Sequence, residues 1–228
     1  IDNRSTDNTV NIAKRFPIDK IQYIDKFLPG KALNQGILLS TGRYIVCLSA
    51  HCVPKNTDWL SSLLKNFEVD KNLAGVYGRQ LPLSFTTDVD KRDLLIVFGR
   101  DRRIQVKDYF FHNANSMIRR EVWDKFPFDK KVTNIEDRVW GKEVISAGYH
   151  IVYDPEASVY HHHGLHQGNM PKRARGVVSI IEHLDHDVSN NLPDSLKPAV
   201  VNIAAVLLVK DKVINDSEDY QLLENAIS

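Results

Sequence analysis

Apolar residues along the first two-thirds of the chain alternate between short continuous runs and stripes with helical spacing. The runs predict strands over residues 21–24, 44–48, 74–77, 151–153 and 158–160. The stripes predict helices after Ser5-Thr6-Asp7, after Thr57 or Asp58, and over residues 31–40, 120–125 and 136–147. Because strands alternate with helices of this length, the sequence predicts βαβ units and an α/β fold with a mainly parallel sheet.

After about Gly164 the pattern changes to helices alone, which are predicted near residues 171–187, 196–210 and 217–227. We therefore expect one α/β domain over residues 1–165, followed by a helical extension over residues 166–228 that packs on the domain or forms an interface. A homodimer through these helices is left open. The apolar segment 200–209 is too short to span a bilayer.

Composition excludes some classes of protein. Hydrophobic residues make up 43% of the chain and charged residues 26%, which is ordinary for a globular domain. Lys and Arg number 30 against 29 Asp and Glu, so overall charge does not favour nucleic acid. Cys47 and Cys52 form no disulfide framework, and no signal peptide or ~20-residue apolar run is present. We expect a cytoplasmic protein. The basic stretch 171–175 leaves open a peripheral contact with the inner face of a membrane.

Polar side chains gather where the predicted strands end, which is where ligands bind in parallel α/β sheets. Residues 2–7 precede a helix, and their carboxylates and backbone N–H groups suit a nucleotide, although helix capping alone also explains them. Ser49 and His51 follow one predicted strand, and His161 to His163 follow another. Since alternate residues of an extended chain share a face, His161 and His163 could both point into a site and bind a metal ion.

Glu136 and Asp137 open a predicted helix. Acidic residues are common at helix N-termini, yet a carboxylate at this end of a cleft could also serve as a general base toward an acceptor hydroxyl. Two further stretches are polar enough for ligand binding, although either could be turn chemistry alone. One is residues 77–80, with Arg79 and Gln80, and the other is residues 112–116, with Asn115.

The order of these segments resembles glycosyltransferase family 2. The first half contains D-N-x-S-T-D-N-T from Asp2, A-L-N-Q-G-I, S-T-G and L-S-x-x-x-x-P. The second half contains Y-G-R-Q, N-A-N-S-M-I-R-R-E-V-W, P-F-D, E-D-R-V-W and A-G-Y-x-I-V-Y-x-P-E-A-x-V-Y-H-x-H. The resemblance covers about residues 1–163 and is strongest to the bacterial branch that includes rhamnosyltransferase-like enzymes of polysaccharide synthesis.

This resemblance implies a GT-A fold, with a Rossmann-like sheet, and a sugar transfer from a nucleotide-sugar donor to a hydroxyl on a saccharide or a lipid-linked acceptor. Asp137 matches the family's catalytic base, and Glu136 lies beside it. We expect the donor to contact Asp2, Ser5, Asp7, Lys31, Asn34, Ser49 and Arg79. We expect the acceptor to contact Gln80, Asn115, Arg138 and Trp140.

The sequence departs from the family in two places. The family has a strand and a helix before the D-N-x-S-T-D motif, so the resemblance implies further sequence upstream of Ile1. The family's metal-binding D-x-D is replaced by Ser49-Ala50-His51. His51 together with His161 or His163 could hold Mn2+ or Mg2+ instead, cationic side chains could replace the metal, or the donor site could have degenerated.

Three functions are thus open: an inverting glycosyltransferase, a catalytically inactive saccharide-binding or scaffold module, and a nucleotidyltransferase. A nucleotidyltransferase can share the α/β layout, but its Gly-rich, basic phosphate loop is not seen in this sequence. The lost carboxylates favour the second function. The presence of Glu136, Asp137 and His161 together favours the first.

Overall fold

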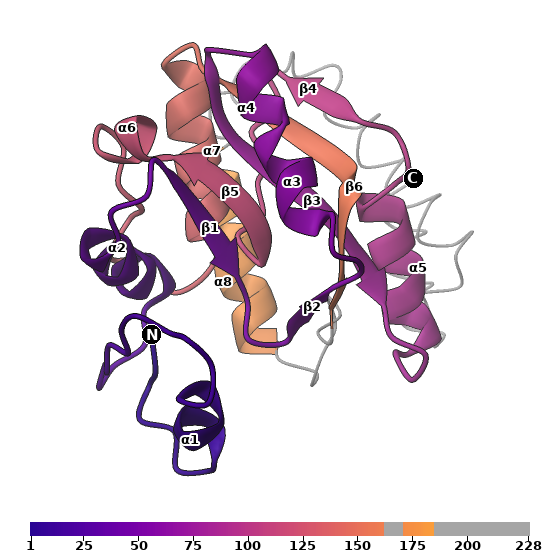
Figure 1. Ribbon diagram of the computed structural model, residues 1–228. Coiled ribbons are helices and arrows are strands. Elements are labelled where there is room, and N and C mark those ends of the chain that lie inside the picture. Colours follow the sequence, from indigo (N-terminus) through magenta and orange to yellow (C-terminus); the bar gives the residue numbers. More distant parts are fainter. Residues whose placement is uncertain (162–170, 185–228) are drawn as a thin grey trace. The chain divides into compact units, whose positions relative to one another are not determined.

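The structure is a computed structural model that describes residues 1–161 and 171–184. A six-stranded mixed sheet lies at the centre of this part of the chain (Figure 1). The chain divides into two units, Ile1–Ile180 and Ile181–Ser228, and the sheet belongs to the first. Its strands are β1 (Tyr44–Leu48), β2 (Cys52–Pro54), β3 (Leu73–Pro82), β4 (Arg103–Gln105), β5 (Asn115–Arg119) and β6 (His150–His161).

Strand directions differ from the sequence prediction. The sheet order is β1-β5-β3-β6-β2, with β4 also paired to β6. Among the hydrogen-bonded strand pairs only β3–β6 is parallel, whereas β1–β5, β3–β5, β2–β6 and β4–β6 are antiparallel. Strands β1, β3 and β6 share one direction, and the sheet is mixed instead of mainly parallel. A predicted helix between two strands shows that they are separated in sequence. It does not show which other strand lies between them in the sheet. Here β5 inserts between β1 and β3 in the opposite direction.

Eight helices accompany the sheet in the described residues. They are α1 (Thr9–Ala13), α2 (Pro29–Leu39), α3 (Trp59–Leu64), α4 (Asn66–Val69), α5 (Asp88–Val97), α6 (Arg120–Trp123), α7 (Glu136–Ser146) and α8 (Pro171–Leu184). The sequence predicted α2, α3, α6, α7 and α8 within a few residues, but it missed α5 and the strands β2, β4 and β5. No helix in residues 1–161 or 171–184 has the length and apolar character needed to cross a membrane. The helices predicted near 196–210 and 217–227 lie outside the described residues.

Two other strand predictions changed. Residues 21–24 form only a single bridge, between Tyr23 and Asp2. The two short strands predicted on either side of Pro155 are one strand, β6, whose register against β3 shifts between Gly78 and Gln80. A proline cannot donate to a ladder, so the irregularity falls where the strand contains one.

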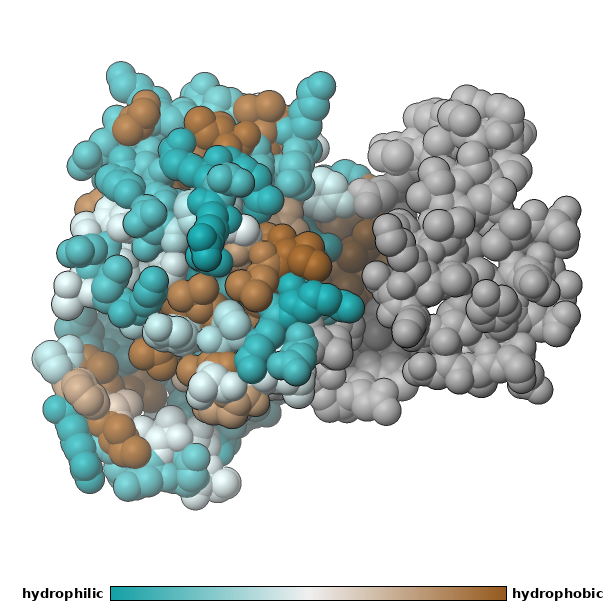
Figure 2. All heavy atoms as spheres, turned by 90° about the vertical axis from the view of Figure 1, so that its right-hand side faces the viewer, coloured by the Kyte–Doolittle hydropathy of each residue, from teal (hydrophilic) through white to brown (hydrophobic). Residues whose placement is uncertain are grey.

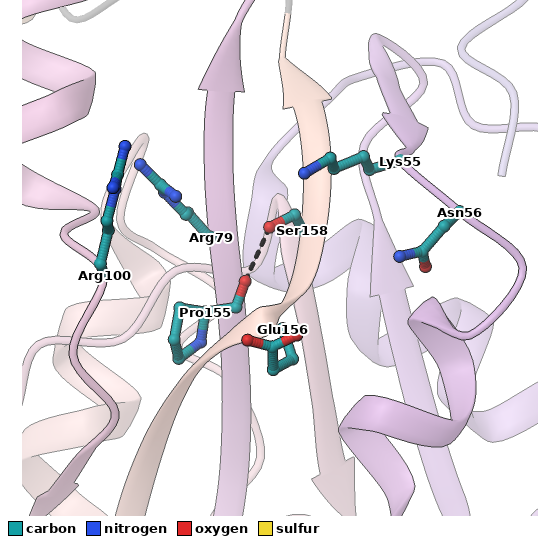
Figure 3. A pocket seen from close by; sticks show the side chains of 7 residues that line it. All are labelled: Lys55, Asn56, Arg79, Arg100, Pro155, Glu156 and Ser158. Carbon is teal, nitrogen blue, oxygen red and sulfur yellow. Dashed lines mark hydrogen bonds between the residues drawn. The ribbon is translucent and has the colours of Figure 1, made fainter.

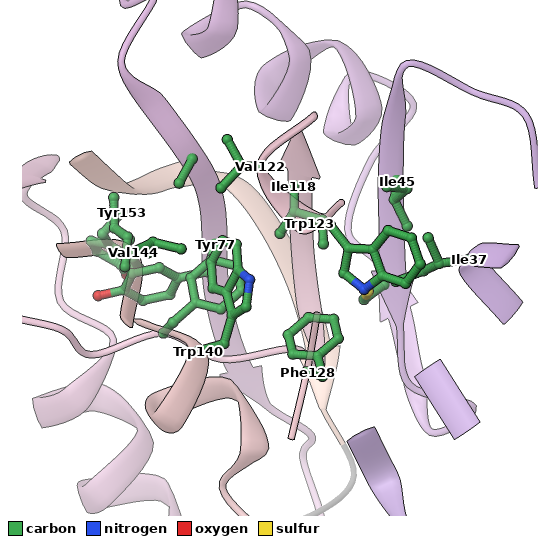
Figure 4. Packing of buried hydrophobic residues seen from close by; sticks show 14 of the residues in the cluster. Ile37, Ile45, Tyr77, Ile118, Val122, Trp123, Phe128, Trp140, Val144 and Tyr153 are labelled. Carbon is green, nitrogen blue, oxygen red and sulfur yellow. The ribbon is translucent and has the colours of Figure 1, made fainter. Parts of the chain in front are cut away.

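Alternation along the strands produces two hydrophobic layers. Val76, Met117 and Val152 face α3 and α4, where they pack on Leu63 and Phe67. Their sequence neighbours on the other face pack with α2, α6 and α7; Figure 4 shows this larger cluster, which includes Tyr77, Ile118, Tyr153, Trp123, Trp140 and Val144. The two layers hold the ends of β1, β5 and β6 in place on a rigid frame.

The outer surface is mostly hydrophilic with scattered hydrophobic side chains, as Figure 2 shows for one face. On α5, Leu95 and Ile96 are exposed by 52% and 70%. Scattered apolar side chains of this kind are normal for a protein surface.

Candidate active site

The carboxylates of Glu136 and Asp137 are both buried in the first turn of α7, with 7% and 8% of each residue exposed. Asn113, just before β5, contacts both of them. Its backbone N–H donates to Asp137 Oδ2 at 3.0 Å, and its side-chain amide donates to Glu136 Oε1 at 3.2 Å. One residue therefore orients both acids.

The residue before this pair has an unusual backbone. Ile135 is the N-cap of α7 and adopts φ 50° and ψ 30°, in the left-handed region. This region is disfavoured for a β-branched side chain and costs on the order of 1–3 kcal/mol. The surrounding structure holds that conformation, and it sets the direction in which α7 presents its two acids.

Burial first, and the neighbouring charge of Asp137 second, raise the pKa of Glu136 to about 7. A carboxyl group with this pKa keeps its proton through much of the range below neutrality. Two buried carboxyl groups so close together resist joint ionisation.

His112 lies next to the acids. Its Nδ1 is 3.9 Å from Asp137 Oδ2 and accepts a hydrogen bond from the backbone N–H of Ala114 at 3.3 Å. The His112 ring thus lies between the backbone of Ala114 and the carboxyl group of Asp137.

Two histidines from other strands reach the same place. His51, in the turn after β1, stacks on His161, at the end of β6, with ring centroids 4.9 Å apart and planes 19° apart. The His161 ring also meets the His112 ring edge-on at 6.4 Å. A continuous chain of contacts thus runs from His51 through His161 and His112 to Asp137, and we call these four residues and Glu136 the His–acid cluster.

The described residues do not fit a metal ion as they stand. Within 1–161 and 171–184, no three His, Cys, Asp or Glu side chains are grouped to hold one. The lone pairs of imidazole lie in the ring plane, so two nearly parallel stacked rings do not converge on one ion. His163, the third predicted ligand, lies outside the described residues.

The opening segment forms its own locally bonded structure. Asp2 accepts hydrogen bonds from the hydroxyl of Ser5 at 2.5 Å and from its backbone N–H at 3.0 Å, and these bonds lower the pKa of the Asp2 carboxyl. Asp7 accepts from the backbone N–H of Thr9 at 2.9 Å at the start of α1, and Lys31 is exposed on α2. Within the described part of the chain, no hydrogen bond or ion pair found joins these four predicted donor residues to the His–acid cluster. Their donor role stays a prediction.

Among the other predicted donor residues, Asn34 is part of the core. Its side chain donates to Phe128 O at 2.8 Å and accepts from Trp123 Nε1 at 2.8 Å and Phe128 N at 3.1 Å. The fold therefore uses the Asn34 amide to join α2 to the segment around α6.

Ser49 lies at the end of β1, two residues before His51, and its carbonyl accepts from Cys52 N at 2.9 Å. Arg79 donates from Nε to Phe98 O at 3.1 Å.

Three of the four predicted acceptor contacts are instead buried. Asn115 donates to Ala157 O at 2.7 Å and accepts from Trp59 Nε1 at 2.8 Å. Trp140 is fully buried between Phe111 and Phe128, and Gln80 is 1% exposed. The fold uses these three side chains in the interior of the sheet, and their acceptor role stays a prediction. Arg138 remains half-buried, with its guanidinium 4.7 Å from the Phe110 ring centroid.

A cavity of about 200 Å³ lies elsewhere on the sheet, beside the irregularity in β6. It is lined by Lys55, Asn56, Arg79, Arg100, Pro155, Glu156 and Ser158 (Figure 3). Of the predicted site residues, only Arg79 lies there. The sequence reasoning singled out neither Lys55 nor Arg100, because isolated basic residues in predicted loops carry no motif.

Comparison with known proteins decides the family. Residues 1–126, more than half of the chain, match the sequence model described as Glycosyl transferase family 2. The chain belongs to glycosyl transferase family 2. The resemblance drawn from the order of the motifs is therefore confirmed.

Two curated proteins are similar to this chain. The O-antigen chain rhamnosyltransferase WbaN of Salmonella anatum is 30% identical over 175 residues, which cover 72% of this chain and 55% of WbaN. The O-antigen chain rhamnosyltransferase RfbN of Salmonella typhimurium is 26% identical over 176 residues, covering 72% and 56%. The chain thus spans about half the length of the curated relatives it matches.

Solved structures share the fold. The mannosyltransferase PcManGT from Pyrobaculum calidifontis, in complex with GDP-Man and Mn2+, superposes with a TM-score of 0.60 at 16% identity, covering 98% of this chain and 68% of that one. TarS 1–349 of S. aureus superposes with a TM-score of 0.57 at 11% identity, covering 86% and 57%. At these identities the likeness establishes the fold, and the predicted α/β class of GT-A type is confirmed.

His112 and Asn113 are the members of this site that the sequence reasoning left without a role. Both lie in the polar stretch 112–116, of which only Asn115 was selected. The available signal was their position just before the predicted apolar pair Met117-Ile118, where a strand of the sheet begins.

Proposed function

We propose that this family 2 chain transfers a sugar from a nucleotide-sugar donor to a hydroxyl group of an acceptor. The observation that carries the proposal is the buried Glu136–Asp137 pair, oriented by Asn113 and linked by ring contacts to His161 and His51. A carboxylate and its neighbouring imidazoles, drawn from α7, β6 and the turn after β1, gather at one place on a rigid frame. This is the kind of arrangement that general-base catalysis requires.

In the proposed reaction, Asp137 takes the proton of the acceptor hydroxyl as its oxygen attacks the anomeric carbon. The bond from that carbon to the diphosphate breaks, and the nucleoside diphosphate leaves with the bonding electrons. Attack from the side opposite the leaving group inverts the anomeric configuration. The raised pKa of Glu136 supports this role, because a protonated Glu136 places no second negative charge beside Asp137.

The names of the relatives suggest the biological setting. WbaN and RfbN are O-antigen chain rhamnosyltransferases, so we propose a role in bacterial surface polysaccharide synthesis, with a saccharide or lipid-linked acceptor. A cytoplasmic location, with peripheral contact at the inner membrane face, follows from the same setting. PcManGT was crystallised with GDP-Man and Mn2+, which supports testing nucleotide-sugars together with a divalent cation.

The test combines binding and turnover. UDP-, dTDP-, GDP- and CMP-sugars are screened by thermal shift, each with Mn2+ or EDTA, since a ligand bound only to the native state raises its melting temperature. With the donor so identified, Asp137→Asn should lower kcat by about 10²- to 10⁴-fold while donor binding is retained. Asp124→Asn, an exposed acid after α6, is the matched control. Unchanged turnover in Asp137→Asn contradicts the assignment of the base.

One observation favours a second function. Ser49 and His51 replace the D-x-D carboxylates, and the described residues around His51 group no third ligand for a metal ion. A saccharide-binding module without catalysis is consistent with that loss. A chain that binds donor or saccharide but neither transfers nor hydrolyses the donor, with or without Mn2+, has this second function.

A further inference from the structure

Three basic residues line the 200 Å³ cavity beside β6, and each comes from a different segment. Lys55 follows β2, Arg79 lies on β3, and Arg100 follows α5. In Figure 3 the ends of Arg79 and Arg100 lie near each other, and Lys55 reaches across β6 toward them. The topology of the sheet, and not the sequence, therefore gathers these charges.

The cavity is built on fixed backbone contacts. The backbone N–H of Lys55 donates to Ser158 O at 3.0 Å, which ties the loop after β2 to β6. The Arg79 Nε donates to Phe98 O at 3.1 Å, which holds one edge of its guanidinium and leaves the terminal nitrogens to the cavity. These contacts fix the backbone of Lys55 and one edge of the Arg79 guanidinium before any ligand binds, and such preorganisation lowers the entropic cost of binding.

The three cations have little negative charge to balance them. None of the salt bridges found among residues 1–161 and 171–184 includes Lys55, Arg79 or Arg100. Glu156 is the single acidic residue in the lining, and in Figure 3 it lies on the other side of Ser158 from the three cationic ends. Like charges that share a concave surface repel each other and attract an anion.

We propose that this cavity binds a phosphate or diphosphate group at a site separate from the nucleotide-sugar donor. Arg presents a planar fork of donors that matches phosphate oxygens, Lys adds a point charge, and the amide of Asn56 adds a neutral donor. The cavity has room for several water-sized groups, and thus for a phosphoryl group with its oxygens.

The separation from the donor rests on which elements form the lining. The donor residues expected from the sequence lie mainly in residues 2–7, on α2 and at the end of β1, and of these donor residues only Arg79 lines the cavity. The phosphate could belong to a phosphorylated acceptor or be a free anion that regulates the enzyme. The binding itself does not depend on the proposed transfer reaction.

Titration calorimetry of the whole chain with inorganic diphosphate tests the site. The double variant Lys55→Gln/Arg100→Gln should bind it about tenfold more weakly, because two charge-assisted contacts are lost. Lys71→Gln/Lys130→Gln removes the same charge from two exposed positions and should leave the affinity unchanged. Equal weakening in both double variants, or no change in either, overturns the proposal. All four replaced side chains are exposed, and melting temperatures of the variants check that folding is retained.

Two further arms identify the source of the phosphate. The first arm compares an alkyl diphosphate with inorganic diphosphate. Tighter binding of the alkyl diphosphate, which is weakened in the Lys55→Gln/Arg100→Gln variant, indicates a phosphorylated acceptor. Equal affinity for the two diphosphates indicates a free anion. Saturation with UDP, dTDP or GDP should leave the Lys55- and Arg100-dependent binding intact. Its loss would assign the cavity to the donor and overturn the separate site. A chain that binds diphosphate here but transfers no sugar contradicts only the proposed function.

Discussion

The raised pKa of Glu136 predicts a pH-dependent loss of stability that the Glu136→Gln variant should abolish. Gln retains the side-chain oxygen that accepts from Asn113 Nδ2 in the native protein at 3.2 Å, but it cannot ionise. The substitution therefore removes the charge and changes the shape of the side chain very little.

The sign and size follow from proton linkage. Below pH 4.5, the ordinary pKa of Glu, the carboxyl is protonated in both the folded and the unfolded chain. Between pH 4.5 and about 7 only the folded chain keeps the proton, so the free energy of unfolding falls as pH rises. A tenfold difference in proton affinity corresponds to about 1.4 kcal/mol. The rise of the Glu136 pKa from 4.5 to about 7 therefore lowers the free energy of unfolding by about 3 kcal/mol once both states are ionised.

Urea denaturation at several pH values from 4.5 to 8 measures this effect. The free energy of unfolding of Glu136→Gln, minus that of the native chain, should rise by about 3 kcal/mol across this range. Glu68→Gln, at an exposed position on α4, should show a constant difference. A constant difference for Glu136→Gln as well would refute the claim that burial and Asp137 hold the proton on Glu136.

Three further predictions concern the frame of the site. Asn115→Ala should lower the free energy of unfolding by about 2–4 kcal/mol, since it leaves Trp59 Nε1 and Ala157 O without their partner; a urea midpoint equal to that of the exposed control Asn11→Ala would contradict this. Trp140→Ala should cost about 3–5 kcal/mol in the same assay and Trp140→Phe clearly less, and equal costs would argue against cavity formation. Gly78→Ala should prevent native folding, because its Cβ would lie 1.9 Å from Ala157 O; a native-like melting temperature would be the contrary result.

The sequence predicted the members of the His–acid cluster better than the rest of the site. Glu136 and Asp137 open a helix, and His51 and His161 follow strands, so local patterns alone place each of them at the end of an element. Ends of neighbouring elements meet, which is why these predicted residues do lie together. His112 was missed because its role depends on contacts with His161 and Asp137, 49 and 25 positions away in the printed sequence.

The sequence could not show which polar side chains are bonded to groups of the protein's own core. Asn34 and Asn115 were predicted to contact the donor and the acceptor. In the structure the side chain of each is hydrogen-bonded to buried groups of the protein, and the partners of Asn34 lie up to 94 residues away in sequence. A buried amide or indole without a partner is costly, so the fold recruits polar residues for its own interior. No local pattern distinguishes that use from binding.

The amino-acid sequence by itself determined the family, the positions of most helices and strands, and the chemical identity of the acids and imidazoles, because these depend on neighbouring residues and on motif order. Only the tertiary structure decided the directions of the strands, the burial that raises the pKa of Glu136, and the gathering of Lys55, Arg79 and Arg100 around one cavity. The reason is physical: burial and electrostatic interaction depend on distance in space, and the residues concerned are brought together only when the sheet has formed.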